Sequence, residues 1–277
     1  MTDIVRQIAD EMLYEGYLLW PYQRPSTSDE QRRMFGCVLP RQWTDAHPTE
    51  RSTIGTECLV DGAGARVEVR ARFLQVVQRQ VLDSRGAHVA DLACRGERYR
   101  PGEEATEREV TTSGLFTIPA GYAREPLQGG ALVRQWRRLD GRLAVVLEPP
   151  GTGPRRLSVS VSNLTAWHGT AQADALESSF CRVHLSLLVV GGAFVSPLDP
   201  RAACCRHEQL WPVLIGEAPD RSSILAAGIM LEEYPNIAAA RPADSPRPRA
   251  PGGAQRNCMA TGSRRSSLTL TSKSAGR

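Results

Sequence analysis

The sequence contains a single lysine, Lys273, among its 34 basic residues. The other 33 are arginines, a bias that reflects a high-GC genome better than selection for guanidinium chemistry. A Walker-type phosphate loop needs a lysine directly after its last glycine, and neither that motif nor a Gly-x-Gly-x-x-Gly run that opens a helix is present. The sequence therefore gives no support for nucleotide-dependent chemistry.

Long apolar runs and an N-terminal signal peptide are also missing. No run approaches the roughly 20 apolar residues that span a bilayer. The first six residues lack the basic start and apolar stretch of a signal peptide. A Gly-x-Ser-x-Gly nucleophile elbow is absent as well. We expect a cytoplasmic protein without a membrane span and without a recognisable hydrolase motif.

The cysteines do not show the regular spacing of a disulfide-bonded protein. The seven cysteines are odd in number and irregularly spaced in a long chain, a pattern that favours reduced thiols over disulfides. Cys37 and Cys58 lie in apolar, strand-like contexts, which predicts that both are core residues.

Charge divides the chain in two. The net charge is +4, but residues 241–277 contain eight basic residues and one acid, Asp244, so the excess of +7 lies there and the remainder is slightly acidic. This segment is rich in Pro, Gly, Ser and Arg, which predicts disorder. We expect one globular β-rich domain over 1–240 and a disordered basic tail over 241–277. Because no basic patch is interleaved with aromatics, specific nucleic-acid binding is not expected.

Alternation of apolar and polar residues predicts strands. It is clearest over 66–82, where Val67, Val69, Ala71 and Phe73 alternate with charged residues, so one face should be buried and the other wet. The Gly-containing link 60–64 predicts a hairpin between this strand and 58–60. Asp140-Gly141 is expected to join two further strands. The predicted strands are 34–39, 58–60, 66–82, 132–137, 143–148, 157–163, 194–198, 210–215 and 224–231.

Two segments show helical spacing of apolar residues, and a third segment is dominated by charged residues. The helices are expected at about 3–15, capped by Asp3, and at 171–188. The stretch 94–126 is predicted to be turn-rich, with the acidic cluster at 103–109 forming a solvated edge or loop. The predicted fold class is α+β and mainly β, with an antiparallel sheet or sandwich-like core and two flanking helices.

The densest sequence signature is the aromatic segment 13–22. It holds Tyr14, Glu15, Tyr17, Trp20 and Tyr22 around one glycine and one proline. Aromatics in this number suit a helix end that turns into a packed strand. They also suit an exposed apolar patch that binds a partner. We therefore treat these five residues as candidates for partner binding.

Several motifs together resemble an uncharacterised bacterial family whose genes tend to lie near those for nickel-iron hydrogenases and their assembly factors. The similarity spans about residues 3–240 and stops where the tail begins, by divergence or by a frameshift. The motifs carry no established catalytic role, so the resemblance implies an accessory or maturation setting and nothing finer. The motifs that carry it are the aromatic segment, 32–36, Thr56-Glu57-Cys58-Leu59, 69–76, 160–165, 194–200, 211–216 and 231–235.

Three polar groups are candidates for chemistry. Cys204, Cys205 and His207 offer thiolate and imidazole ligands for zinc, nickel or copper, although adjacent cysteines chelate poorly. Cys181 and His184 would share a helix face, where a buried, hydrogen-bonded His184 is the alternative to a ligand. Glu57, set between apolar neighbours, needs an ion-pair partner or a raised pKa; Arg24, Arg32 and Arg33 are candidate partners.

The sequence thus favours a non-enzymatic accessory protein that binds a partner protein, such as hydrogenase subunits or assembly factors, and needs no cofactor. Two alternatives stay open. One is a metal-handling factor built on Cys204, Cys205 and His207. The other is a hydrolase or transferase with an unrecognised active site that includes Tyr14, Glu15 and Glu57.

Overall fold

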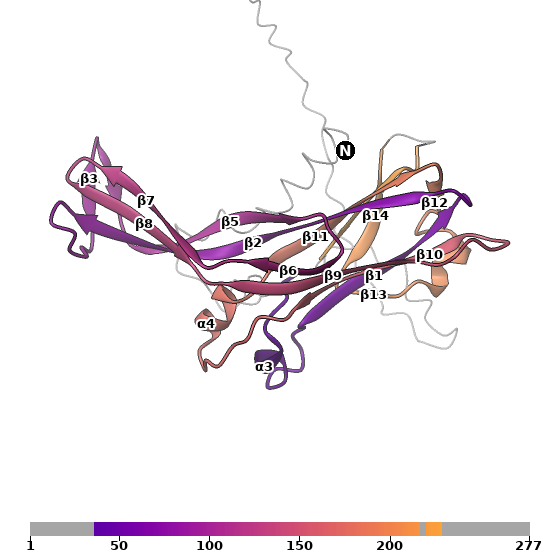
Figure 1. Ribbon diagram of the computed structural model, residues 1–277, viewed down its shortest axis with the longest axis horizontal. Coiled ribbons are helices and arrows are strands. Elements are labelled where there is room, and N and C mark those ends of the chain that lie inside the picture. Colours follow the sequence, from indigo (N-terminus) through magenta and orange to yellow (C-terminus); the bar gives the residue numbers. More distant parts are fainter. Residues whose placement is uncertain (1–35, 217–219, 229–277) are drawn as a thin grey trace, which may run out of the picture. The chain divides into compact units, whose positions relative to one another are not determined.

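The computed structural model describes residues 36–216 and 220–228, which form two antiparallel sheets (Figure 1). Within this part of the chain, the first sheet has the order β12 (Ala193–Phe194), β1 (Thr53–Asp61), β10 (Arg155–Asn163), β9 (Leu139–Leu147) and β6 (Gly114–Ile118), and β13 (His207–Glu208) also pairs with β1. The helix predicted at 3–15 and the tail 241–277 lie outside the described residues.

The second sheet is built around the long strand β2 (Arg66–Asp83). β11 (Cys181–Val190) and β8 (Gly130–Trp136) follow one another along one edge of β2, and β5 (Gly102–Val110) pairs with the opposite edge. The outer strands are β15 (Ser223–Ala227) and β14 (Trp211–Ile215) beside β11, and β7 (Gly121–Leu127) beside β8. β3 (Leu92–Cys94) and β4 (Glu97–Tyr99) form a separate pair.

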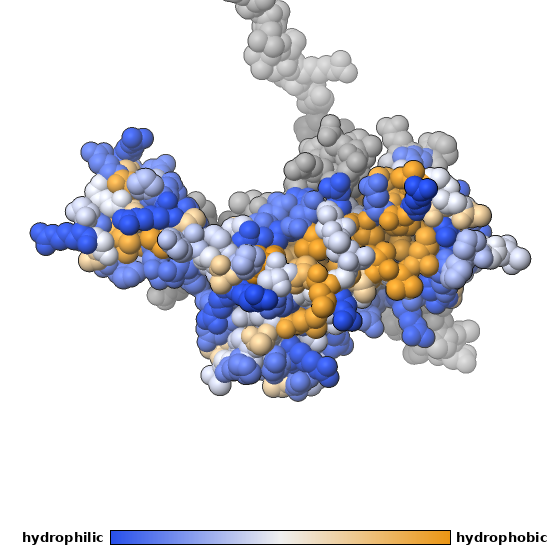
Figure 2. Space-filling view, viewed as in Figure 1, coloured by the Kyte–Doolittle hydropathy of each residue, from blue (hydrophilic) through white to orange (hydrophobic). Residues whose placement is uncertain are grey.

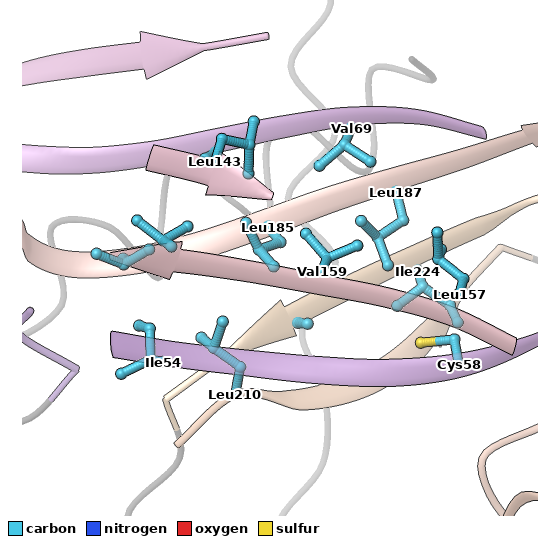
Figure 3. Packing of buried hydrophobic residues seen from close by; sticks show 14 of the residues in the cluster. Ile54, Cys58, Val69, Leu143, Leu157, Val159, Leu185, Leu187, Leu210 and Ile224 are labelled. Atoms are coloured by element: carbon cyan, nitrogen blue, oxygen red, sulfur yellow. The ribbon is translucent and has the colours of Figure 1, made fainter. Parts of the chain in front are cut away.

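The two sheets bury their apolar faces against each other. Side chains of β1, β10 and β9 meet those of β2, β11 and β15 in one core, in which Ile54, Leu143, Leu157, Leu185 and Ile224 are fully buried. Figure 3 shows these side chains pointing into the space between the strands. The prediction of a mainly β protein with antiparallel, sandwich-like sheets is therefore confirmed.

The helices are shorter than predicted. α4 covers only Gln172–Glu177, and residues 181–190 form β11, so the expected helix at 171–188 is wrong over most of its length. Val183, Leu185, Leu187 and Val189 all enter the core, which is the period of a strand. The positive φ of Arg182 (55°) and a bulge before His184 interrupt this period, and they give the segment its helix-like spacing. The other described helices are α3 (Arg41–Thr44) and the 3-10 turn η1 (Pro200–Cys204).

The predicted hairpin between β1 and β2 is also wrong. β1 pairs with β10, β12 and β13, whereas β2 pairs in the other sheet, so the link after Asp61 crosses between the sheets. Gly62 has φ +113° and accepts a hydrogen bond from the Ala65 N–H at 3.1 Å. This link is the first change of sheet among the described strands.

Other segments were assigned correctly as strands but with different partners or bounds. Asp140 and Gly141 lie inside β9 rather than in a turn, and β8 and β9 belong to different sheets. The prediction that 94–126 is turn-rich is wrong, because this stretch forms β4, β5, β6 and most of β7. Its acidic cluster lies on β5, at the edge of a sheet, which is one of the two settings predicted for it. Of the expected strand at 34–39, Val38 forms an isolated bridge with Phe180.

The faces of β2 follow the predicted alternation only in part. Val69, Ala71 and Phe73 are buried as expected, but Arg72 on the opposite face is also buried and pairs with Glu107 of β5. Leu74 and Val76 belong to a second cluster with Cys37, Trp43 and Trp167, against which Leu176 of α4 packs. Both faces of the middle of β2 are therefore covered, as the continuous burial from Ala71 to Val77 shows.

Two of the crossing links touch each other through their backbones. A Cβ at Gly192, between β11 and β12, would lie 2.3 Å from the Asp61 carbonyl oxygen and 2.6 Å from the Ala65 Cβ. A Cβ at Gly62 would lie 2.9 Å from the Gly191 carbonyl oxygen. Only glycine permits this approach, which holds the two sheets together at one end of the core.

We predict that Gly192→Ala lowers the free energy of unfolding by about 1–3 kcal/mol, because the added methyl must displace backbone. Gly64→Ala is the matched control, since a Cβ there meets nothing within 4 Å. Chemical denaturation of both variants checks this. Equal stability of the two variants would contradict the close approach.

Candidate functional site

Glu57 ties the segment before β13 to the first sheet. Its backbone N–H donates to the Arg206 carbonyl oxygen at 2.9 Å, and its carboxylate Oε2 accepts from the Arg206 N–H at 2.9 Å. The Ser158 hydroxyl donates to Oε1 at 3.3 Å, and Arg156 Nη1 lies 3.5 Å from Oε2. The carboxylate is thus half-buried and fully hydrogen-bonded, which indicates a structural role.

The expected ion-pair partners Arg24, Arg32 and Arg33 lie outside the described residues, and Arg156 is the partner that the structure shows. Arg156 stands beside Glu57 because β10 pairs with β1, with Leu59 opposite Arg156 and Glu57 opposite Ser158. This pairing joins residues about one hundred positions apart in sequence. No local pattern in the sequence indicates it.

Cys204, Cys205 and His207 lie close along the chain but have different surroundings. The Cys204 thiol is exposed and accepts a hydrogen bond from Arg156 Nη2 at 3.4 Å, while Cys205 packs beside Leu59 and Val195. His207 Nδ1 lies 2.9 Å from the hydroxyl of Thr56, a buried residue, and its ring meets Trp211 edge-on. Thr56 and Glu57 are neighbours on a strand and point to opposite faces, so His207 and Cys204 are directed to opposite sides of β1.

Burial disfavours the charged forms of Cys58, Cys205 and His207. Burial raises the pKa of Cys58 to about 12 and, together with the neighbouring Cys204, raises that of Cys205 to about 11. Burial lowers the pKa of His207, although Glu57 opposes this shift. Within residues 36–216 and 220–228, no three His, Cys, Asp or Glu side chains are grouped so that they could hold a metal ion.

The other predicted site residues are placed as follows. Cys37 and Cys58 are buried, as predicted. His184 is buried on β11, opposite Arg72 of β2 and on the other face from the core residues Val183 and Leu185. Its burial is as predicted, but its helical setting is wrong. Tyr14, Glu15, Tyr17, Trp20 and Tyr22 lie outside the described residues.

Sequence reasoning missed an opening into the core between β2 and β9. β5 pairs with β2 only from Ala71 to Arg79, and β6 pairs with β9 only from Leu139 to Leu143. Among the described strands, residues 66–70 of β2 and 144–147 of β9 therefore have a neighbour on one side only. The link 111–113 carries the chain from the end of β5 to the start of β6 and lies where both strands stop pairing with β2 and β9.

A pocket of about 360 Å³ lies at this opening and is called the edge groove here; it is lined by Val67, Glu68, Val69, Arg70, Thr111, Ser113 and Val145. Val67, Val145 and Leu147 pack against the core but are only partly buried. Figure 2 shows a large apolar area between the paths of β2 and β9, beyond the ends of β5 and β6. No pattern in the sequence indicates this opening, because the stretch that forms β5 and β6 is predicted to be turn-rich.

The chain was compared with known proteins. No protein-family model matches it, and no curated protein is similar to it. None of the helices in the described part of the chain has the length and apolar character needed to cross a bilayer.

We predict that Glu57→Ala destabilises the protein by about 1–2 kcal/mol, because the Arg206 N–H loses its acceptor and Arg156 loses its carboxylate. Glu57→Gln is the control that keeps an acceptor oxygen. Thermal unfolding and amide exchange at residues 200–208 measure the effect. Unchanged exchange at Arg206 in Glu57→Ala would contradict this role.

We predict that iodoacetamide modifies Cys205 slowly at pH 8, since a pKa of about 11 leaves about one thiol in a thousand as thiolate. The rate should rise about tenfold for each pH unit up to pH 10. Tandem mass spectrometry of the wild-type protein, which separates labels on the adjacent Cys204 and Cys205, follows the reaction. A rate that levels off below pH 9 would show that the thiol ionises more easily than its burial allows.

Proposed function

We propose that the protein is an accessory protein that binds a partner protein during nickel-iron hydrogenase assembly or function. The observation that carries the binding proposal is the edge groove, where apolar core and strand edges are both accessible. Sheet edges and apolar clefts are the surfaces that extended peptide segments bind. The hydrogenase setting is supported by the sequence motifs, one of which, 69–76, includes the groove residues Val69 and Arg70.

A metal-handling function has less support. Cys204 and His207 are directed to different sides of β1, and Cys205 packs among apolar side chains. The aromatic segment 13–22 remains a second candidate surface for the partner, through Tyr17 and Trp20.

The test is purification of the tagged full-length chain from cells that express a nickel-iron hydrogenase. We predict that hydrogenase subunits or assembly factors co-elute in stoichiometric amounts, because burial of the partly exposed valines of the edge groove stabilises a complex. Quantitative mass spectrometry, with the same cells lacking the hydrogenase genes as control, measures this. A protein that elutes alone from both strains would contradict the proposal.

A further inference from the structure

We propose that the edge groove binds an extended segment of the partner protein as an added strand, antiparallel to residues 66–70 of β2. This inference rests on the proposed function and specifies how the partner is bound. It also specifies the chemistry of the segment: valine-like residues at alternate positions, with charged residues of defined sign between them.

The pairing of β2 explains where the added strand would lie. β5 runs antiparallel to β2 and its last pair is Val110 with Ala71. The chain then leaves β2 through 111–113 to enter the first sheet at Gly114, which has φ +118°. The line of β5 is therefore vacant beside 66–70 among the described residues, while β11 occupies the opposite edge of the same residues. A strand in this line would extend β5 without displacing any described strand.

The apolar positions of the segment follow from strand alternation. Val67 and Val69 point toward the core, and Val145 of β9 lines the same groove. Residues directly opposite in paired strands point to the same face. An incoming strand therefore places apolar side chains opposite Val67 and Val69, where they would cover core surface that β5 and β6 leave accessible.

The charged positions follow from the outward residues of β2. β5 places glutamates near the arginines of β2, as in the pair Arg70 with Glu109 at 3.1 Å. Arg66 and Glu68 are exposed, and no ion pair among the described residues includes either of them. A segment with an acid opposite Arg66 and a base opposite Glu68 continues the charge pattern of the β2 and β5 pair.

The probe is a capped, fluorescent peptide that contains Glu-Val-Lys-Val-Glu, titrated into the full-length protein and followed by anisotropy. We expect saturable binding that weakens about tenfold or more in Val145→Lys, because a charge in the groove opposes burial of the valines. The matched control is Val146→Lys on the same strand, whose wild-type side chain points outward and is 60% exposed. Val67→Lys is the second groove variant, and thermal unfolding confirms that each variant is folded.

A charge exchange tests the register. Arg66→Glu should weaken binding about threefold, and the peptide Glu-Val-Lys-Val-Lys should restore it, since its last residue lies opposite position 66 only in the antiparallel arrangement. Binding that is equal in Val145→Lys, Val146→Lys and wild type would overturn the inference. So would sedimentation data in which two copies of this chain dimerise and Val145→Lys makes them monomeric.

The two proposals fail in distinguishable ways. Hydrogenase proteins that co-elute equally with wild type and Val145→Lys would leave the proposed function standing and overturn the groove as the site. Peptide binding that follows the predicted variants, with no hydrogenase protein recovered, would support strand addition and contradict the hydrogenase setting.

Discussion

Burial of two apolar sheet faces against each other is the interaction on which the rest of this structure depends. Each sheet has one face rich in Val, Leu and Ile, and neither face is stable in water without the other. Successive strands change sheet repeatedly, as β1 to β2, β5 to β6, β8 to β9 and β11 to β12 show. Gly62 and Gly192 permit the links β1 to β2 and β11 to β12 to approach each other through their backbones. The same arrangement places Arg156, Glu57 and Arg206 side by side.

The proposed binding surface is a consequence of how this core is covered. β2 is 18 residues long and β5 is nine, so one edge strand cannot cover the whole of its neighbour. β6 has five residues and its neighbour β9 has nine, and the two short strands β5 and β6 are joined at 111–113. Beyond the ends of β5 and β6, the side chains of Val67, Val145 and Leu147 pack against the core but are only partly buried. An added strand would complete both the pairing of β2 and the burial of the core.

The sequence predicted which residues are strands better than it predicted how they pair. Alternation identified β2 and β10 because inward and outward residues differ in polarity along each strand. The partner of β1 could not be predicted, since a glycine-rich link fits a hairpin and a crossing between sheets equally well. The sequence predicts a helix where β11 lies, because the bulge between Cys181 and His184 brings residues three apart onto one face of the strand. Likewise, the role of Glu57 depends on Arg156 and Arg206, which only pairing across the sheet brings near.

The most direct test of strand addition at the edge groove is hydrogen exchange of the full-length protein with and without the Glu-Val-Lys-Val-Glu peptide. Backbone amides of an added strand and of the edge it joins become hydrogen-bonded and exchange more slowly. We predict slower exchange over residues 66–70 on peptide binding and no change in the edge strand β14. Unchanged exchange over 66–70, or slowing confined to β14, would contradict the claim that the groove between β2 and β9 is where a partner strand binds.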